Sequence, residues 1–160
     1  MPDLHEIATA YHEAGHAVVA LALGRPVQRV SVEPNHLRLG VCEIRKGTFR
    51  PSKDWLETEV LILLGGLAAE ARHAGDYHWD AASQDLRNVR MLTKQRAGSA
   101  SQIDRLERRL LDKTEHLLDR PGHWEAVELI AAELLRCAVI SGRAARHLFD
   151  QAAARAERER

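Results

Sequence analysis

The sequence of 160 residues lacks several features that mark common classes of protein. Its two cysteines, Cys42 and Cys137, form no CxxC pair and no disulfide framework, which favours a reducing compartment. Lys and Arg number 23 and Asp and Glu number 23, so no basic surplus points to nucleic acid as the main partner. No GxxxxGK[ST] segment is present, so the sequence holds no phosphate loop of the ATPase kind.

Long apolar runs are also missing. The longest, VLILLGGLAA over residues 60–69, is too short to span a bilayer. The N-terminal MPDLHEIATA has no basic stretch followed by an apolar segment, so a signal peptide is not expected. We therefore expect a cytoplasmic protein without membrane insertion, in which residues 1–160 form a single domain.

The spacing of apolar residues predicts a mainly α-helical fold with one small β-sheet, an α+β architecture. A helix is expected over about residues 3–23, ended by Gly24 and Pro26. Two β-branched or alternating stretches, residues 26–34 and 37–45, are expected as strands. The remaining helices are expected over residues 52–73, 82–96, 101–119, 124–135 and from 141 onward, with Ser52, Ser101 and Ser141 as N-caps.

The first predicted helix contains the segment YHEAGHAVVA, residues 11–20, which has the HExxH spacing. His12 and His16 lie four residues apart, about 40° around a helix axis, so both imidazoles can reach one metal ion. Glu13 lies about 60° from His16 on the same side, where it can contact a metal-bound water. Two histidine ligands and a neighbouring general base are the arrangement of zinc peptidases.

Small residues suggest which helix packs on this one. Gly15 in mid-helix costs about 1 kcal/mol against alanine, which suggests close packing at that point. The segment LLGGLAAEA, residues 63–71, offers a matching small surface. Catalytic zinc usually has three protein ligands, and spacing alone cannot choose the third. The candidates are Glu70, His73, Asp76, His78, Asp80 and Asp85.

These segments together resemble the peptidase domain of FtsH-type membrane AAA proteases. HEAGHAVVA is similar to the zinc helix of that family, and PVQRVSVEP followed by LG is similar to its short strand pair. ILLGGLAAEA is similar to LLGGRAAEE, and AASQDL is similar to GASNDL. The last helices, WEAVELIAAELL and ISGRAARHLF, also look like those of the family, so the resemblance runs from residue 10 to about 149.

The resemblance implies a zincin-like HExxH helix in an FtsH-peptidase-type helical domain that binds Zn²⁺. His12 and His16 would be ligands, Asp85 would be the third ligand, and Glu13 would be the catalytic base. Glu70 would support the site, while His73 and His78 are expected in solvated positions. The sequence departs from the family pattern: AASQDL lacks the glycine of GASNDL, RAGSASQ replaces a YGM segment, and ATPase and transmembrane segments do not occur.

The expected function is zinc-dependent endopeptidase cleavage of unfolded or flexible protein segments, ATP-independent within this chain. A separate ATPase could deliver substrates, the strand over residues 39–44 could pair with an extended peptide, and a homo-oligomer is compatible with the resemblance. The alternatives are a catalytically silent zinc-binding regulatory module, a metal-free helical adaptor and a peptidase dedicated to one regulatory protein.

The tryptophans, the cysteines and a cluster of arginines are also assigned from the sequence. Trp124 is expected in the core, and both cysteines are expected as small core residues. Trp79 could line the pocket, as the less favoured alternative to a structural position. The arginines Arg105, Arg108 and Arg109 are interleaved with acids and are expected on a solvated helix face.

Overall fold

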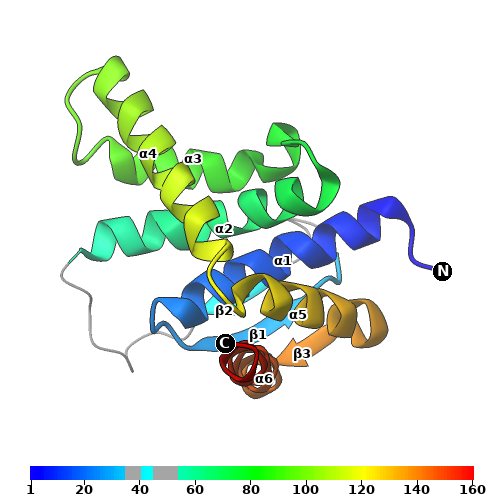
Figure 1. Cartoon of the computed structure of the whole chain (residues 1–160). Coiled ribbons are helices and arrows are strands. Elements are labelled where there is room, and N and C mark those ends of the chain that lie inside the picture. The colour runs from blue at the N-terminus through cyan, green and yellow to red at the C-terminus, as the bar shows by residue number, and fades with distance from the viewer. Residues whose placement is uncertain (35–40, 45–53) are drawn as a thin grey trace.

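The computed structural model describes residues 1–34 and 54–160 together with the backbone of residues 41–44 (Figure 1). Its elements follow in chain order: α1 (Leu4–Ala22), β1 (Val27–Ser31), β2 (Val41–Ile44), α2 (Trp55–Ala74), the 3-10 helix η1 (Trp79–Ala82), α3 (Ser83–Thr93), α4 (Ala100–Leu118), α5 (His123–Cys137), β3 (Val139–Ser141) and α6 (Gly142–Arg158). The predicted class, mainly helical with a small sheet, is confirmed.

Helix α1 runs through the middle of the molecule (Figure 1). It begins with a capping box, in which the Asp3 side chain accepts from the Glu6 backbone N–H and the Glu6 side chain accepts from the Asp3 backbone N–H. It packs against α2 on one side and against α5 and the sheet on the other. Because neighbours cover α1 on several sides, its polar residues 12, 13 and 16 are buried rather than solvated.

The sheet has three antiparallel strands in the order β2-β1-β3. The two predicted strands, β1 and β2, pair with Val30 opposite Cys42 and Ser31 opposite Val41. The third strand was not predicted from the sequence. It pairs Ile140 with Val30 and Val139 with Ser31, on the other side of β1. Leu37, Leu39 and the turn at Asn35 lie outside the described residues.

Two predicted N-caps are wrong. Helix α2 begins at Trp55 and is capped by Asp54, whose side chain accepts from the Glu57 backbone N–H at 3.0 Å, whereas Ser52 lies outside the described residues. Helix α4 is capped by Ser99 instead of Ser101. The caps at Gly75, in the left-handed conformation after α2, and at Ser141 before α6 are confirmed.

The predicted third helix is shorter than expected, and a 3-10 turn precedes it. A 3-10 turn covers Trp79–Ala82, and α3 then runs only from Ser83 to Thr93. Its buried residues Asp85, Val89 and Thr93 recur every four positions, so one face of α3 packs on the body. Helices α3 and α4 form a hairpin whose tip projects away from the rest of the molecule (Figure 1).

The core collects small and aliphatic residues from the helices and from β1 and β3. Trp124, expected in the core, is only partly buried and packs against it. Cys137 is exposed, so its predicted core position is wrong, and the side chain of Cys42 lies outside the described part. Arg105, Arg108 and Arg109 are exposed, as predicted. In the described residues, no helix combines the length and the apolar character needed to cross a bilayer.

Candidate metal centre

Helix α1 carries His12, Glu13 and His16 into the interior beneath α2. The rings of His12 and His16 lie edge to face, with centroids 4.7 Å apart, as i, i+4 spacing on a helix requires. The three side chains are buried, and one ligand atom from each lies within 4.8 Å of the others. Such burial is unusual for three polar residues on adjacent turns and is typical of a metal or catalytic site.

Asp85 approaches from the first turn of α3. Its Oδ2 lies 2.9 Å from Nε2 of His12 and 3.1 Å from Nε2 of His16. Around a tetrahedral zinc ion, ligand atoms at about 2.0–2.1 Å lie about 3.3 Å from one another. The two observed separations are slightly shorter than that value, so a small outward movement of the side chains accommodates an ion between the three groups.

The opposite ring nitrogens of both histidines contact α2. Nδ1 of His16 donates to the backbone carbonyl of Ile62 at 2.7 Å, and Nδ1 of His12 donates to Oε2 of Glu70 at 3.1 Å. A hydrogen bond at Nδ1 fixes the ring orientation and directs Nε2 toward a metal. Glu70 therefore occupies a supporting position beside His12, on the ring nitrogen facing away from Asp85.

Glycines bring α2 close enough for these contacts, and the predicted close approach of the two helices is confirmed. A Cβ on Gly15 would lie 2.2 Å from the carbonyl oxygen of Gly65. A Cβ on Gly66 would lie 2.6 Å from Nε2 of His16 and 2.7 Å from Nε2 of His12. Gly66 thus leaves open the space next to both Nε2 atoms, a requirement that sequence spacing did not reveal.

The charges of His12, His16 and Asp85 influence one another. Burial disfavours the charged imidazole of His12, but hydrogen bonds with Asp85 and Glu70 outweigh it and raise the pKa of His12 from 6.5 to about 9. Burial also opposes ionisation of Asp85, yet the charge of His16 and the hydrogen bond with His12 hold the pKa of that carboxyl well below its usual range. Without metal, a proton on His12 therefore balances the charge of Asp85.

The other third-ligand candidates lie elsewhere. His73 is exposed near the end of α2, where its ring stacks on Tyr11 at a centroid distance of 3.8 Å. His78 is exposed and lies 3.5 Å from Oε1 of Glu70. Asp76 and Asp80 are exposed in and just after the turn between α2 and η1. Among the six candidates, Asp85 is the one that contacts both Nε2 atoms.

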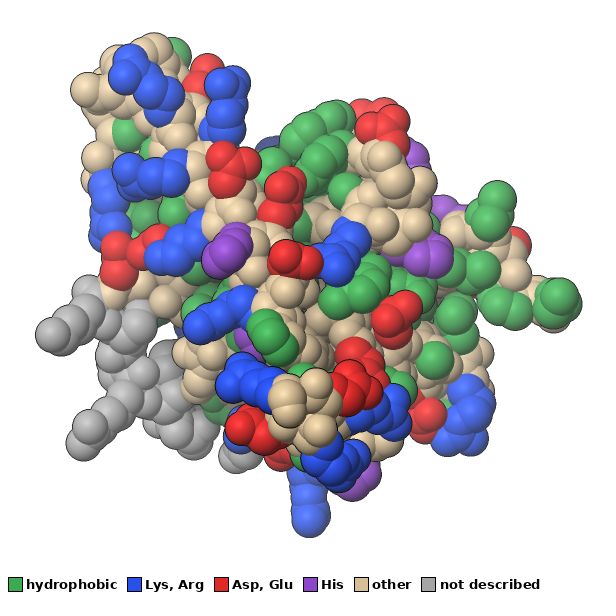
Figure 2. Space-filling view, viewed as in Figure 1, with side chains coloured by type: hydrophobic (Ala, Val, Ile, Leu, Met, Phe, Trp, Pro, Cys, Tyr) green, Lys and Arg blue, Asp and Glu red, His purple; other side chains and the backbone are tan. Residues whose placement is uncertain are grey.

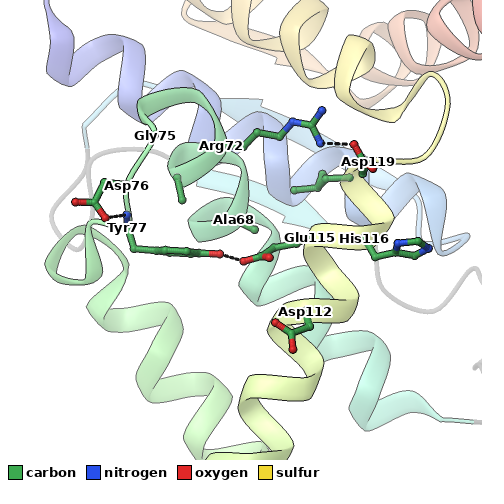
Figure 3. A pocket seen from close by; sticks show the side chains of 11 residues that line it. Ala68, Arg72, Gly75, Asp76, Tyr77, Asp112, Glu115, His116 and Asp119 are labelled. Carbon is green, nitrogen blue, oxygen red and sulfur yellow. Dashed lines mark hydrogen bonds and ion pairs between the residues drawn. The ribbon is translucent and has the colours of Figure 1, made fainter.

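A cavity of about 620 Å³ lies beside this turn, between the end of α2 and α4 (Figure 3). Across it, the Tyr77 hydroxyl donates to Glu115, and Arg72 donates to Asp119 at 3.1 Å. Trp79 is half exposed and stacks on Tyr77 at a centroid distance of 4.8 Å. These contacts tie the segment that precedes α3 to the body, which helps to hold Asp85 at the histidines.

The sequence comparisons give the family. The sequence model of peptidase family M41 matches residues 2–99, which contain His12, Glu13, His16, Glu70 and Asp85. The chain belongs to peptidase family M41. The M41 match ends one residue before α4, so the resemblance noted in the last helices lies beyond it.

Curated relatives bear names from the same family. The chain is 41% identical over 76 residues to an ATP-dependent zinc metalloprotease FtsH of Acidobacterium capsulatum, covering 44% of this chain and 12% of the relative. It is 36% identical over 90 residues to the FtsH of Protochlamydia amoebophila, covering 54% and 10%. It is 46% identical over 66 residues to that of Magnetococcus marinus, covering 39% and 10%. The matched part thus spans about a tenth of these relatives.

The residues of the cluster fit a zinc ion. Two imidazole nitrogens and a carboxylate oxygen are ligands that zinc accepts in catalytic sites. Both imidazoles have a hydrogen-bonded second nitrogen, and Gly66 leaves the adjacent space open. The geometry and chemistry of the donor set therefore both suit zinc.

Proposed function

We propose that the chain is a zinc-dependent endopeptidase that hydrolyses peptide bonds in unfolded or flexible protein segments. The observation that carries the proposal is the convergence of His12, His16 and Asp85, in contacts between two helices that span 73 and 69 residues of the sequence. His12, His16 and Asp85 would hold the zinc ion. Membership of a peptidase family supports the same reaction.

The reaction follows from the positions of the side chains. Zinc supplies a Lewis acid, which acidifies water and polarises a carbonyl oxygen. Glu13, buried next to both histidines, would take the proton of the attacking water on its carboxylate and deliver it to the leaving amine nitrogen. Glu70 would hold His12 through Nδ1, and Ile62 would hold His16 through its backbone carbonyl.

The sheet suggests how a polypeptide could be held. Within the described strands, β2 pairs only with β1 and lies at the edge of the sheet. An extended peptide can add to such an edge through backbone hydrogen bonds, which favour unfolded substrates of varied sequence. These 160 residues contain no phosphate loop, so we expect the substrates to be flexible already or to be delivered by a separate ATPase.

Replacement of Glu13 by glutamine tests the mechanism. Glu13→Gln keeps the size and burial of the side chain but removes the base, so cleavage of unstructured casein should fall by about 10²- to 10⁴-fold. Zinc content should remain near one ion per chain, because Glu13 is not a proposed ligand. Glu157→Gln, at an exposed position near the end of α6, is the matched control and should cleave casein at the wild-type rate.

Two results would refute the proposal. Equal casein cleavage by the wild type and Glu13→Gln would rule out Glu13 as the base. A wild-type protein that binds one zinc ion but cleaves neither casein nor a peptide library would indicate the catalytically silent zinc-binding module.

A further inference from the structure

The overall charge of zero hides an uneven distribution. Residues 86–113, which form most of the α3–α4 hairpin, contain eight Lys and Arg against three Asp and Glu, a net charge of +5. The remainder of the chain therefore carries −5. In Figure 2, several blue side chains lie over the projecting hairpin at the upper left of the view, and others lie at the bottom of the molecule. A charge of this size on a protruding hairpin attracts anionic partners.

Several of these cations form no ion pair with the residues that the structure describes. Arg90 pairs with Glu107 and Asp104, Arg96 with Asp54, and Lys113 with Glu57. Five others have no carboxylate within salt-bridge distance anywhere in the described residues, namely Arg87, Lys94, Arg105, Arg108 and Arg109. All five side chains are exposed, so they remain available to a partner.

Part of this basic surface is concave. A cavity of about 560 Å³ lies where the end of α3 meets the first turns of α4. Arg105 and Arg109 line it, one turn apart on α4, together with Arg96 and Gln102, and Leu106 and Ala97 add apolar surface to the lining. A site of this kind suits a short segment with carboxylate and aliphatic side chains, because the guanidinium groups bind carboxylates and the apolar surface covers methylene groups.

A polypeptide fits these features better than a nucleic acid. Proteins that bind single strands stack bases on aromatic side chains, and residues 86–113 contain no Phe, Tyr or Trp. A long polyanion would also extend from the hairpin toward the remainder of the chain, which carries −5. A short acidic segment can remain on the hairpin.

We propose that the cavity lined by Arg105 and Arg109, with the surrounding unpaired arginines, is a docking surface for an acidic segment of a polypeptide. Docking at this surface does not require peptidase activity. Helix α3 carries Asp85 at its start and leads at its end into the segment that lines the cavity, so a docked polypeptide lies on the same hairpin as Asp85, at its other end. The surface would thereby recruit proteins with acidic, flexible segments.

The test uses the full chain carrying Glu13→Gln, so that the probe is not cleaved. A dye-labelled twelve-residue peptide of repeated Glu-Glu-Gly-Leu should bind by fluorescence anisotropy, and the Gln-Gln-Gly-Leu counterpart should bind at least tenfold more weakly. Arg105→Glu with Arg109→Glu should weaken binding of the acidic peptide at least tenfold. Arg143→Glu with Arg158→Glu, which changes the net charge equally on exposed positions of α6, should change it less than twofold.

Equal losses in the two double variants would overturn the proposal, because net charge alone would then explain binding. Tighter binding of a single-stranded oligonucleotide of the same charge would also overturn it, assigning the surface to nucleic acid. Circular dichroism checks folding, and if the glutamate pair unfolds, Arg105→Gln with Arg109→Gln should still weaken binding severalfold. The binding assay does not depend on cleavage. A failure of the peptide to bind therefore leaves the peptidase proposal intact, and a lack of casein cleavage leaves the docking proposal intact.

Discussion

At the scale of single residues, Gly66 determines whether the two imidazoles can be presented side by side. It faces the Nε2 atoms of His12 and His16, the proposed zinc ligands, and any side chain there would lie against both rings. Hydrogen bonds from Nδ1 of His16 to Ile62 and from Nδ1 of His12 to Glu70 then fix the orientation of both rings. The arrangement of the two rings therefore depends on glycine at position 66 as much as on the polar side chains.

Gly66→Ala should weaken zinc binding by about 10- to 100-fold, the range seen when the groups that orient metal ligands are disturbed. The added methyl would lie 2.6–2.7 Å from the two Nε2 atoms, so the rings must move. Gly98→Ala is the control, since a Cβ there meets only Gln102 Oε1 at 3.6 Å. Competition with a chromophoric chelator gives the affinities. Equal affinities for Gly66→Ala and Gly98→Ala would contradict this role.

The sequence identified part of this site on physical grounds and part only by resemblance. The HExxH spacing placed His12, Glu13 and His16 on one side of a helix because helical periodicity is local. Asp85 was one of six candidates until the resemblance favoured it, since a contact across 69 residues leaves no trace in spacing. The role of Gly66 and the Ile62 carbonyl followed only from the structure, because both depend on how two helices pack.

At the scale of elements, the α1–α2 contact depends on glycine in both helices. Gly15 and Gly65 face each other so closely that a Cβ on Gly15 would lie 2.2 Å from the Gly65 oxygen and 2.5 Å from the Ala69 Cβ. Backbone atoms cannot rotate away as the end of a long side chain can. The separation of the two helices is therefore set by glycine.

Gly15→Ala should destabilise the protein despite the better helix propensity of alanine. Alanine gains about 1 kcal/mol in a helix interior, whereas overpacking costs about 1–3 kcal/mol or more. Since the clash is with the backbone of α2, we expect a net loss of about 1–2 kcal/mol in the free energy of unfolding. Urea denaturation measures it, with Gly98→Ala as the control. A variant as stable as the wild type would show that the helices separate without cost.

The ends of helices and strands were predicted less well than their types, and the reason differs from one element to the next. Ser99 and Ser101 flank the same helix start, and nothing local separates them as caps. Asp54 caps α2 and also binds Arg96, a contact 42 residues away. Strand β3 has three residues, too few for an alternating pattern, and exists because β1 pairs with it.

At the scale of the whole molecule, zinc and protons should compete for the same site. The pKa of His12 is about 9 in the metal-free protein, above the ordinary 6.5, because Asp85 and Glu70 favour the charged ring over the opposing effect of burial. A raised pKa contributes stability that is fully present below pH 6.5 and is lost as the pH rises through 9. Zinc binding requires the neutral ring, so it gains in strength over the same range.

The metal-free protein should therefore lose about 1–3 kcal/mol of unfolding free energy between pH 6.5 and pH 9. The stabilisation by zinc should increase over that interval. Urea denaturation in EDTA and in micromolar zinc, at both pH values, measures the two trends. His12→Asn in EDTA is the control and should show a smaller decline. A metal-free wild type that is equally stable at both pH values would contradict the proposed charge balance.

A crystal structure of the zinc-loaded chain tests the central claim most directly. We predict one ion with Nε2 of His12 and of His16 at about 2.0–2.1 Å and a carboxylate oxygen of Asp85 at about 2.0–2.2 Å. An ion bound to Glu70 in place of Asp85, or no ion between α1 and α3, would contradict the account.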